Sequence, residues 1–283
     1  MSLRRVALVA LLAALVACTA EPAPQAEPTT PSPTPTSQPE PVVIAVKGDW
    51  GAGTRQQRQV TRRMCEARAR EPFDIVMTTG DNFYPSGRAT EQTYVMPERC
   101  LYEHPSHRWR ATWGNHDAAD STAEALDSER YYRWSAGGAD FFALDSNDPT
   151  DPQQRAWLVE QLAASTAAIK IAYFHHPPFT AGSVHQGAPA VRNLWVPLFE
   201  RFGVRLVLAG HSHLYERFRV KGIDYVTTGG GGAVLYRCVE GRDPPPVVCI
   251  SEHHFLLLEI DGERIEVRAI ARDGSVIDRF ARP

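Results

Sequence analysis

Five short apolar segments of this chain each end in a polar motif, and this recurrence constrains the fold more than any other feature. The motifs carry Asp, Asn and His side chains and are Gly48-Asp49-Trp50-Gly51, Gly80-Asp81-Asn82-Phe83-Tyr84, Gly114-Asn115-His116-Asp117, His175-His176-Pro177 and Gly210-His211-Ser212-His213. Each apolar segment has the length of a strand. Polar residues that follow successive strands at one end of a sheet can converge, so the five motifs predict a single shared site.

The order of the apolar segments indicates an α/β architecture. We expect strands over residues 42–46, 74–79, 109–113, 141–144, 169–174 and 204–209, with helices over 54–70, 152–164 and 191–202. Further strands are expected over residues 223–228, 255–260, 265–270 and 276–280, without helices between them and with Asp-Gly turns at 261–262 and 273–274. Alternation followed by strands alone predicts a four-layer α-β-β-α sandwich, two packed mixed sheets flanked by helices, in one domain over residues 42–283.

Residues 1–18 have the pattern of a secretory signal. Arg4 and Arg5 precede an uncharged run over residues 6–17, which is shorter than the ~20 residues that span a bilayer as a helix. The following Cys18 completes a Leu-Val-Ala-Cys segment that resembles the lipobox of bacterial lipoproteins, in which the cysteine is acylated. We therefore expect an exported bacterial lipoprotein, anchored to the membrane through its N-terminal lipid on the cell surface or the periplasmic side. The alternative is an ordinary signal peptide with an incidental cysteine.

Residues 19–41 lack the composition of a folded segment. Eight prolines fall between positions 21 and 41, with no aliphatic residue larger than alanine, so no core can form there and we expect a disordered linker. A formal net charge of −3 gives no electrostatic basis for nucleic-acid binding.

Four further cysteines lie beyond the linker, and an even number in an exported chain predicts two disulfides. Three pairings are possible. The preferred one joins Cys65 to Cys100 and Cys238 to Cys249, because it closes the two shortest loops. None of the four has the spacing of a metal site.

The polar motifs have the chemistry of a hydrolytic centre with two metal ions. Carboxylate, amide and imidazole groups bind hard divalent and trivalent cations. A carboxylate can bridge two ions, and ions ~3.5–4 Å apart can hold both ends of an in-line displacement at phosphorus. His211 and His213 are two residues apart, so their side chains point the same way from an extended segment.

The five motifs, in order over residues 42–232, resemble the calcineurin-like metallophosphoesterase superfamily and, within it, the purple (tartrate-resistant-type) acid phosphatases. The superfamily usually begins with Asp-x-His, whereas Gly51 stands at the histidine position after Asp49. In the purple branch a tyrosine replaces that histidine, and Tyr84 stands at the family's position in the second motif. The resemblance to the purple branch therefore rests on two features together, the missing histidine at Gly51 and the tyrosine at Tyr84.

The resemblance implies two metal ions and seven ligands. The first ion is Fe(III) in that family, and its implied ligands are Asp49, Tyr84 and His213. The second is Fe(II), Zn(II) or Mn(II), with the implied ligands Asn115, His175 and His211. Asp81 is implied as the bridge between them. The resemblance also implies His116 and His185 as catalytic residues near the phosphate and the leaving group, and the less favoured alternative for each is a surface or supporting histidine.

The implied reaction is the hydrolysis of small phosphate monoesters through attack of a metal-bound hydroxide, without a phosphoenzyme. A Mn- or Zn-dependent phosphodiesterase or nucleotide hydrolase of the same superfamily is the first alternative. The second is a non-catalytic surface lipoprotein with the same fold, against which the retention of all seven ligand-type residues argues.

Other polar features are expected to be structural. His176 is expected not to bind metal, because His175 occupies the ligand position. The glycine run over residues 229–232 lacks the lysine and Ser/Thr of a P-loop and is expected to pass close beneath the metals. Asp117 and Asp145 are expected to orient histidines or to cap turns.

Overall fold

Six strands form the first of two sheets in the computed structural model, which describes residues 40–85 and 87–283. The order across this sheet is β13-β12-β11-β1-β2-β3. The bounds are β1 Val42–Lys47, β2 Ile75–Thr78, β3 Arg108–Ala111, β11 His254–Asp261, β12 Arg264–Ala271 and β13 Val276–Arg282. Strands β1, β2 and β3 are parallel, whereas β11, β12 and β13 form antiparallel hairpins. This sheet is therefore mixed.

The second sheet has seven strands in the order β10-β8-β9-β7-β6-β5-β4. The bounds are β4 Tyr132–Ala136, β5 Ala139–Ala143, β6 Ile169–Tyr173, β7 Leu206–Ala209, β8 Tyr215–Val220, β9 Ile223–Thr228 and β10 Val248–Ile250. Its centre, β5-β6-β7-β9, is parallel and its edges are antiparallel. The inner faces of the two sheets bury one apolar cluster, to which β1 contributes Ile44 and β5 contributes Phe141.

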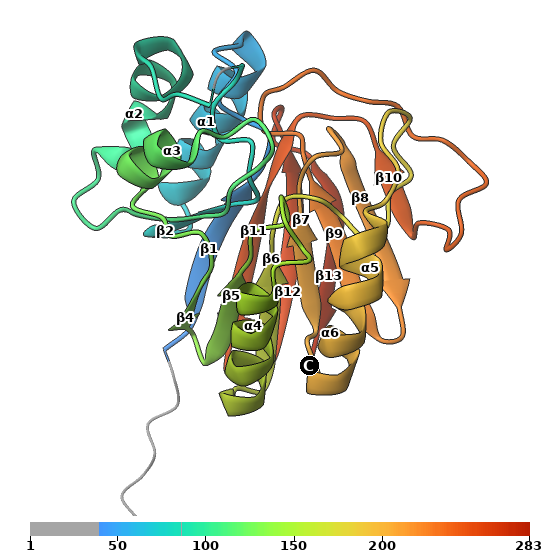
Figure 1. Cartoon of the computed structure of the whole chain (residues 1–283). Helices are drawn as coiled ribbons and strands as arrows, with labels where there is room; N and C mark the ends of the chain where they lie inside the picture. The colour runs from blue at the N-terminus through green and yellow to red at the C-terminus, as the bar shows by residue number, and fades with distance from the viewer. Residues whose placement is uncertain (1–39, 86) are drawn as a thin grey trace, which may run out of the picture. The chain divides into compact units, whose positions relative to one another are not determined.

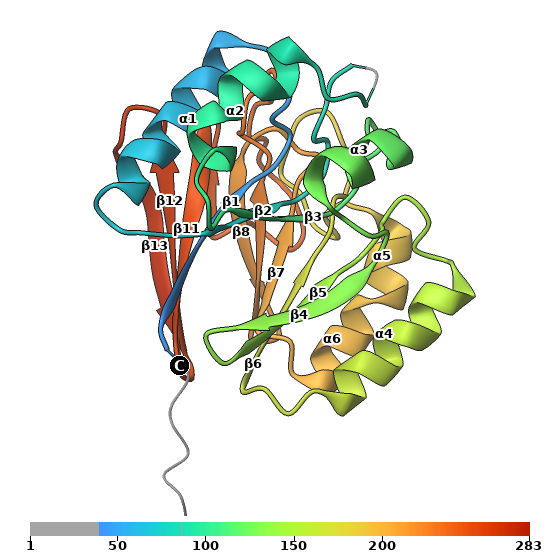
Figure 2. The same ribbon diagram turned by 90° about the vertical axis from the view of Figure 1, so that its left-hand side faces the viewer.

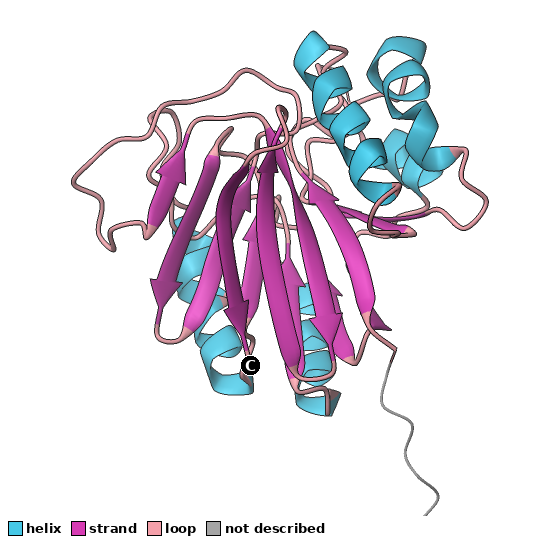
Figure 3. Cartoon of the chain, turned by 180° about the vertical axis from the view of Figure 1, so that it is seen from behind, coloured by secondary structure: helices cyan, strands magenta, loops and turns pink. Residues whose placement is uncertain are grey.

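Helices cover the outer faces of both sheets (Figures 1 and 2). The first sheet carries α1 Arg55–Arg68, a π-helical turn at Glu91–Val95, α2 Met96–Tyr102 and α3 Ala119–Leu126, and the second carries α4 Pro152–Ala164, α5 Pro189–Leu194 and α6 Val196–Phe202. Two separate apolar clusters lie under these groups of helices. Figure 3 shows the strands facing the viewer, with some helices behind them and the others at the upper right. The predicted four-layer α-β-β-α sandwich is confirmed.

The carboxyl ends of the central strands from both sheets meet at one end of the fold. The Asp49 N–H donates to the Gly80 carbonyl at 3.1 Å, which joins the chain after β1 to the chain after β2. The Gly231 N–H donates to the Gly48 carbonyl at 2.9 Å, which joins the chain after β9 in the second sheet to the chain after β1 in the first. The motifs therefore share one edge, as the sequence predicts.

Most predicted elements are present, but the single helix predicted over residues 191–202 is wrong. The chain forms α5 and α6, separated at Trp195. Pro197 accounts for the break, because it has no N–H to donate and its ring would clash with the carbonyl four residues earlier in a continuous helix. The structure also contains β4, β8, β10, α2 and α3, which the sequence patterns did not predict.

Two disulfides fasten the outer parts of the fold, and both pair as preferred. Cys65 in α1 is bonded to Cys100 in α2, and Cys238 is bonded to Cys249 in β10. The second bond closes the loop that follows the glycine run. The predicted signal and linker, including Cys18, lie outside the described residues apart from the last positions of the linker. None of the described helices has the length and hydropathy of a membrane span.

Stability is expected to fall in acid because of His254, a fully buried residue at the start of β11. Burial lowers the pKa of His254 to about 4, whereas an unfolded histidine has a pKa of about 6.5. The unfolded chain therefore binds a proton that the folded chain excludes between these values, and stability decreases as pH falls from 6.5 to 4.

Between pH 7 and pH 4 this one group contributes a loss of about 3 kcal/mol in the free energy of unfolding. Urea unfolding at both pH values should show a smaller loss for His254→Gln than for the unmodified chain. Equal losses of unfolding free energy in the two proteins would contradict the assignment of this pH dependence to His254.

Candidate metal centre

Three of the ligand-type residues follow their strands in the left-handed backbone region. Asp49 after β1 has φ 55°, Asp81 after β2 has φ 49°, and His211 after β7 has φ 68°. This conformation costs non-glycine residues about 1–2 kcal/mol each, and such strain concentrates at functional sites. The residues around them are also closely packed: a Cβ atom at Gly114 would lie only 2.1 Å from Asp81 Oδ1. The site is thus built on sharply turned, tightly packed strand ends.

The first group of donor atoms surrounds the phenol of Tyr84. Its Oη lies 3.2 Å from Asp49 Oδ1, 2.7 Å from Asp81 Oδ2 and 3.1 Å from His213 Nε2. His213 Nε2 also lies 3.3 Å from Asp49 Oδ1. Four side chains from three separate motifs thus place donor atoms around one small volume.

The second group surrounds the buried ring of His175. Its Nε2 lies 3.1 Å from Asn115 Oδ1, 3.2 Å from His211 Nδ1 and 3.4 Å from Asp81 Oδ1. Asp81 belongs to both groups, since its Oδ2 contacts Tyr84 and its Oδ1 faces His175. The structure therefore brings all seven predicted ligand residues together, in two groups that share one carboxylate.

Backbone carbonyls fix the tautomers of two of these histidines. Thr79 O lies 2.9 Å from His175 Nδ1, and Val234 O lies 2.8 Å from His213 Nδ1. A carbonyl only accepts, so both Nδ1 atoms donate and each neutral ring turns its Nε2 lone pair toward a carboxylate. Each Nε2 and the carboxylate that it faces therefore need a positive charge between them, which either a proton on Nε2 or a bound metal ion supplies.

Electrostatics also favour a cation at this place. Burial and the charges of Asp49 and Asp81 raise the pKa of the Tyr84 phenol far above its ordinary value. Burial alone would lower the pKa of His175, but the charge and hydrogen bond of Asp81, the charge of Asp49 and the Thr79 carbonyl together outweigh it and raise that pKa to about 9. Burial, followed by the charge of His175, lowers the pKa of His211 to about 2. Without a bound cation, the negative charge of these buried carboxylates is therefore offset by protons held on neighbouring side chains.

Comparison with known proteins gives the family. The sequence over residues 42–215, more than half of the chain, matches the calcineurin-like phosphoesterase family. The chain belongs to this family. Its members are phosphoesterases that use metal ions, which agrees with the two groups of donor atoms.

Purple acid phosphatases are among the relatives of this phosphoesterase. Purple acid phosphatase 7 of Arabidopsis thaliana is 26% identical over 231 residues, covering 68% of this chain and 70% of the relative. Tartrate-resistant acid phosphatase type 5 of Mus musculus is 27% identical over 252 residues, covering 71% of this chain and 74% of the relative.

Solved structures agree on the fold. The purple acid phosphatase PPD1 of yellow lupin (Lupinus luteus) superposes with a TM-score of 0.70 at 17% identity, covering 86% of this chain and 54% of the other. GAP50, the anchor in the inner membrane complex of Plasmodium, superposes with a TM-score of 0.74 at 16% identity, covering 85% of this chain and 88% of the other.

Asp117 holds two of the motifs of this phosphoesterase in place. Its carboxylate accepts hydrogen bonds from the N–H groups of Asn82, Phe83 and Gly114. Asp145 likewise accepts from the N–H of Asn147 in its own turn and from Arg130. Of the two roles expected for these aspartates, the structure shows the stabilisation of turns and no hydrogen bond from either to a described histidine.

The two histidines predicted to be catalytic lie beside the donor groups. His116 is exposed, with its ring 4.7 Å from that of Tyr84, and its N–H donates to Asp81 Oδ1 at 2.8 Å. His185 is half-buried and stacks on His211, with ring centroids 3.9 Å apart. Both side chains can therefore reach a substrate that is bound at the donor groups.

His176 lies closer to the centre than its structural interpretation implies. His175, His176 and His211 offer ring nitrogens that all lie within 4.8 Å of one another. However, Ser146 Oγ lies 2.9 Å from His176 Nδ1, and burial lowers the pKa of His176 to about 3. These contacts agree with a supporting position beside the second group.

Sequence patterns missed the loop that closes the site from the side of β10. Tyr236 stacks on His213 with ring centroids 4.3 Å apart, and its Oη lies 3.3 Å from His185 Nε2. The glycine run before it passes close to the donor groups as expected, since a Cβ atom on Gly229 would lie 3.0 Å from Asp49 Oδ2. Tyr236 belongs to no recognisable motif, and the only sequence signal for this loop is the nearby Cys238.

Proposed function

We propose that this phosphoesterase hydrolyses small phosphate monoesters at a binuclear metal centre, in the manner of a purple acid phosphatase. The observation that carries this proposal is the division of seven donor side chains into two groups that share Asp81, with the phenol of Tyr84 in the first group. The usual superfamily site has the histidine of Asp-x-His as a ligand, and the phenol of Tyr84 distinguishes this site from it.

We assign the first ion, Fe(III), to Asp49, Tyr84 and His213, and the second, Fe(II), Zn(II) or Mn(II), to Asn115, His175 and His211. Asp81 has one oxygen in each donor group and would bridge the two ions. A trivalent ion reverses the local preference for a protonated phenol and favours the phenolate of Tyr84. Two bound ions supply Lewis-acid polarisation of a phosphate oxygen and lower the pKa of a bound water.

The chain's own residues complete the proposed reaction. The ring of His116 lies beside Tyr84 in the first donor group, and the ring of His185 stacks on His211 in the second. Each ring can donate a proton to the departing alcohol oxygen. Tyr236 holds His185 Nε2 from the side. No serine or cysteine nucleophile is required, so we expect direct transfer of the phosphoryl group to water.

We also propose that the chain is exported and held at a membrane through a lipid on Cys18. The support is the sequence alone: a basic start, a short apolar run and a lipobox-like segment, followed by a proline-rich linker. The proposed partners are a small phosphorylated substrate and the membrane.

The proposal is tested by comparing 4-nitrophenyl phosphate with bis(4-nitrophenyl) phosphate. We expect kcat/KM to be at least about tenfold higher for the monoester, and no phosphoenzyme in rapid-quench labelling. A preference for the diester would favour the phosphodiesterase alternative, and a covalent phosphoenzyme would contradict transfer to water.

A further inference from the structure

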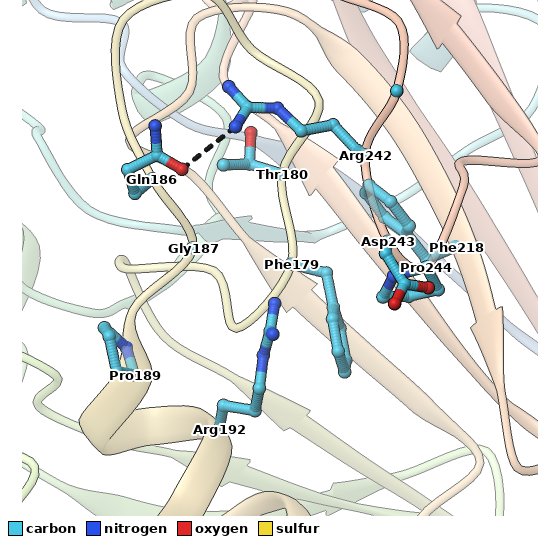
Figure 4. A pocket seen from close by; sticks show the side chains of 11 residues that line it. Phe179, Thr180, Gln186, Gly187, Pro189, Arg192, Phe218, Arg242, Asp243 and Pro244 are labelled. Carbon is cyan, nitrogen blue, oxygen red and sulfur yellow. Dashed lines mark hydrogen bonds between the residues drawn. The ribbon is translucent and has the colours of Figure 1, made fainter.

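A pocket of about 350 Å³ lies next to the candidate metal centre and contains none of its donor residues. We call it the arginine pocket, and Figure 4 shows its lining residues, Phe179, Thr180, Gln186, Gly187, Pro189, Arg192, Phe218, Gly241, Arg242, Asp243 and Pro244. Gln186 directly follows His185, and Thr180 Oγ1 lies 2.8 Å from the Oγ of Ser212, the residue between His211 and His213. The pocket therefore adjoins the site without being part of it.

Two guanidinium groups line this pocket. Arg192 extends from α5 toward its middle, where its guanidinium lies 4.5 Å from the centre of the Phe179 ring (Figure 4). The Nε of Arg192 donates to Pro178 O at 3.0 Å. Arg242 donates to Gln186 Oε1 at 2.9 Å and to Gly182 O at 3.0 Å. Both groups are thus held by neutral acceptors.

The charge of these arginines is not balanced by hydrogen-bonded carboxylates among the described residues. The nearby acid Glu216 is buried behind Thr180 and accepts from the Ala181 N–H at 2.6 Å. Burial raises the pKa of Glu216 to about 7, so it carries at most part of a charge at neutral pH. Asp243 is the one acid in the lining, which leaves the arginine pocket with a net charge of +1.

An unsatisfied donor in the same place points to a ligand. Arg242 Nε is buried and has no hydrogen-bond partner among the described residues. A buried N–H without a partner is costly, so a bound acceptor would be favourable there. Guanidinium groups bind planar acid groups through paired N–H donors.

The pocket is also preformed, and part of its lining is apolar. Phe179, Phe218, Pro189 and Pro244 line it, and its volume is typical of a site for a small molecule. The Cys238–Cys249 disulfide closes the loop that supplies Arg242 and Asp243. A ligand would therefore not have to order this wall on binding, which lowers the entropic cost of association.

We propose that the arginine pocket binds a small organic monoanion, with its acid group on Arg192 and Arg242 and the rest of the molecule against the apolar part of the lining. A carboxylate matches the net charge of +1 better than a phosphate dianion. This site is separate from the proposed phosphatase reaction and does not depend on it.

The test is calorimetric titration of the purified protein with benzoate, and with benzamide, its uncharged counterpart. Benzoate should bind at one site per chain, and benzamide should bind at least about tenfold more weakly. Phenylphosphonate distinguishes the two kinds of acid group: weaker binding than that of benzoate is expected at a carboxylate site, and tighter binding would contradict the proposed monoanion.

Substitutions then locate the bound anion. Arg192→Gln and Arg242→Gln should each weaken benzoate binding about tenfold. The control is Arg201→Gln, because the Arg201 guanidinium also lies over a phenylalanine ring, at 5.0 Å from the centre of Phe202, but does not line the pocket. Thermal unfolding midpoints equal to that of the unmodified protein would show that the variants are folded.

Three further results would overturn the proposal. Equal binding of benzamide and benzoate would exclude an anion site. Unchanged benzoate binding in both arginine variants would place the ligand elsewhere. Loss of benzoate binding in His211→Ala, with retention in the arginine variants, would show that the anion binds at the metal centre.

Discussion

Replacing Asp81 by alanine should lower kcat/KM for a phosphate monoester by about 10³-fold or more, because Asp81 is the proposed bridge between two metal ions that would contribute several kcal/mol to charge stabilisation in the transition state. The side chain of Asp81 contacts both donor groups, through Oδ2 to Tyr84 and Oδ1 to His175. Its removal should also reduce the bound metal from two ions per chain to one or none. Steady-state kinetics and elemental analysis of the same samples measure both effects.

The matched control is Asp140→Ala, which removes another buried aspartate near the amino end of β5. Asp140 accepts hydrogen bonds from Arg133, Ser135 and Ser165 and contacts no donor of the metal centre. This variant should lose stability but retain two metal ions and its turnover. Full activity and two bound ions in Asp81→Ala would contradict the assignment of the bridge.

Replacing Glu98 by alanine should destabilise the fold by about 3–5 kcal/mol, the usual cost of leaving a buried charge without its partner. Glu98 in α2 forms an ion pair with Lys47 at the end of β1, and both side chains are fully buried. Gln57 and Thr61 of α1 donate to the other Glu98 oxygen at 2.9 Å. Lys47 Nζ also lies 3.8 Å from the centre of the Trp50 ring.

This ion pair ties the helical layer to the strand that presents Asp49, so metal affinity should fall together with stability. Urea unfolding measures the loss in the free energy of unfolding. Pairing Glu98→Leu with Lys47→Met replaces both charges by apolar groups and should restore most of the lost stability. A loss below about 1 kcal/mol in Glu98→Ala would contradict a structural role for the pair.

Elements with strong local signals could be predicted from the sequence. Residues 42–46 of β1 form an unbroken apolar run that is mostly β-branched, because they are buried alternately against the other sheet and against α1. Helix α4 was predicted with its observed bounds, Pro152–Ala164, since Pro152 is favourable at the first helical position and Asp151 caps the N–H groups of Gln153 and Gln154.

Elements stabilised by distant partners could not be predicted in this way. Strand β8 contains Glu216, Arg217 and Arg219, whose charges are unusual in a buried strand. The structure explains them, because Arg217 pairs with Asp278 of β13 and Arg219 pairs with Asp224 of β9. These contacts join residues from different strands and leave no periodic pattern in the local sequence.

The residues of the site also divide into those that the sequence could predict and those that it could not. The seven ligand-type residues directly follow strands, so their meeting could be predicted once the strands were placed. Tyr236 and the carbonyls of Thr79 and Val234 act through backbone geometry and loop packing, for which no motif exists. Sequence motifs therefore predict the donors well and the groups that orient them poorly.

The most direct test of the proposed binuclear centre is the visible absorption spectrum and metal content of the purified protein, beside Tyr84→Phe. The account predicts two metal ions per chain, with iron in one position, and a charge-transfer band in the visible region that Tyr84→Phe abolishes while the fold is retained. A colourless protein with two Mn or Zn ions, or a protein that binds no metal, would contradict the Fe(III)–tyrosinate centre.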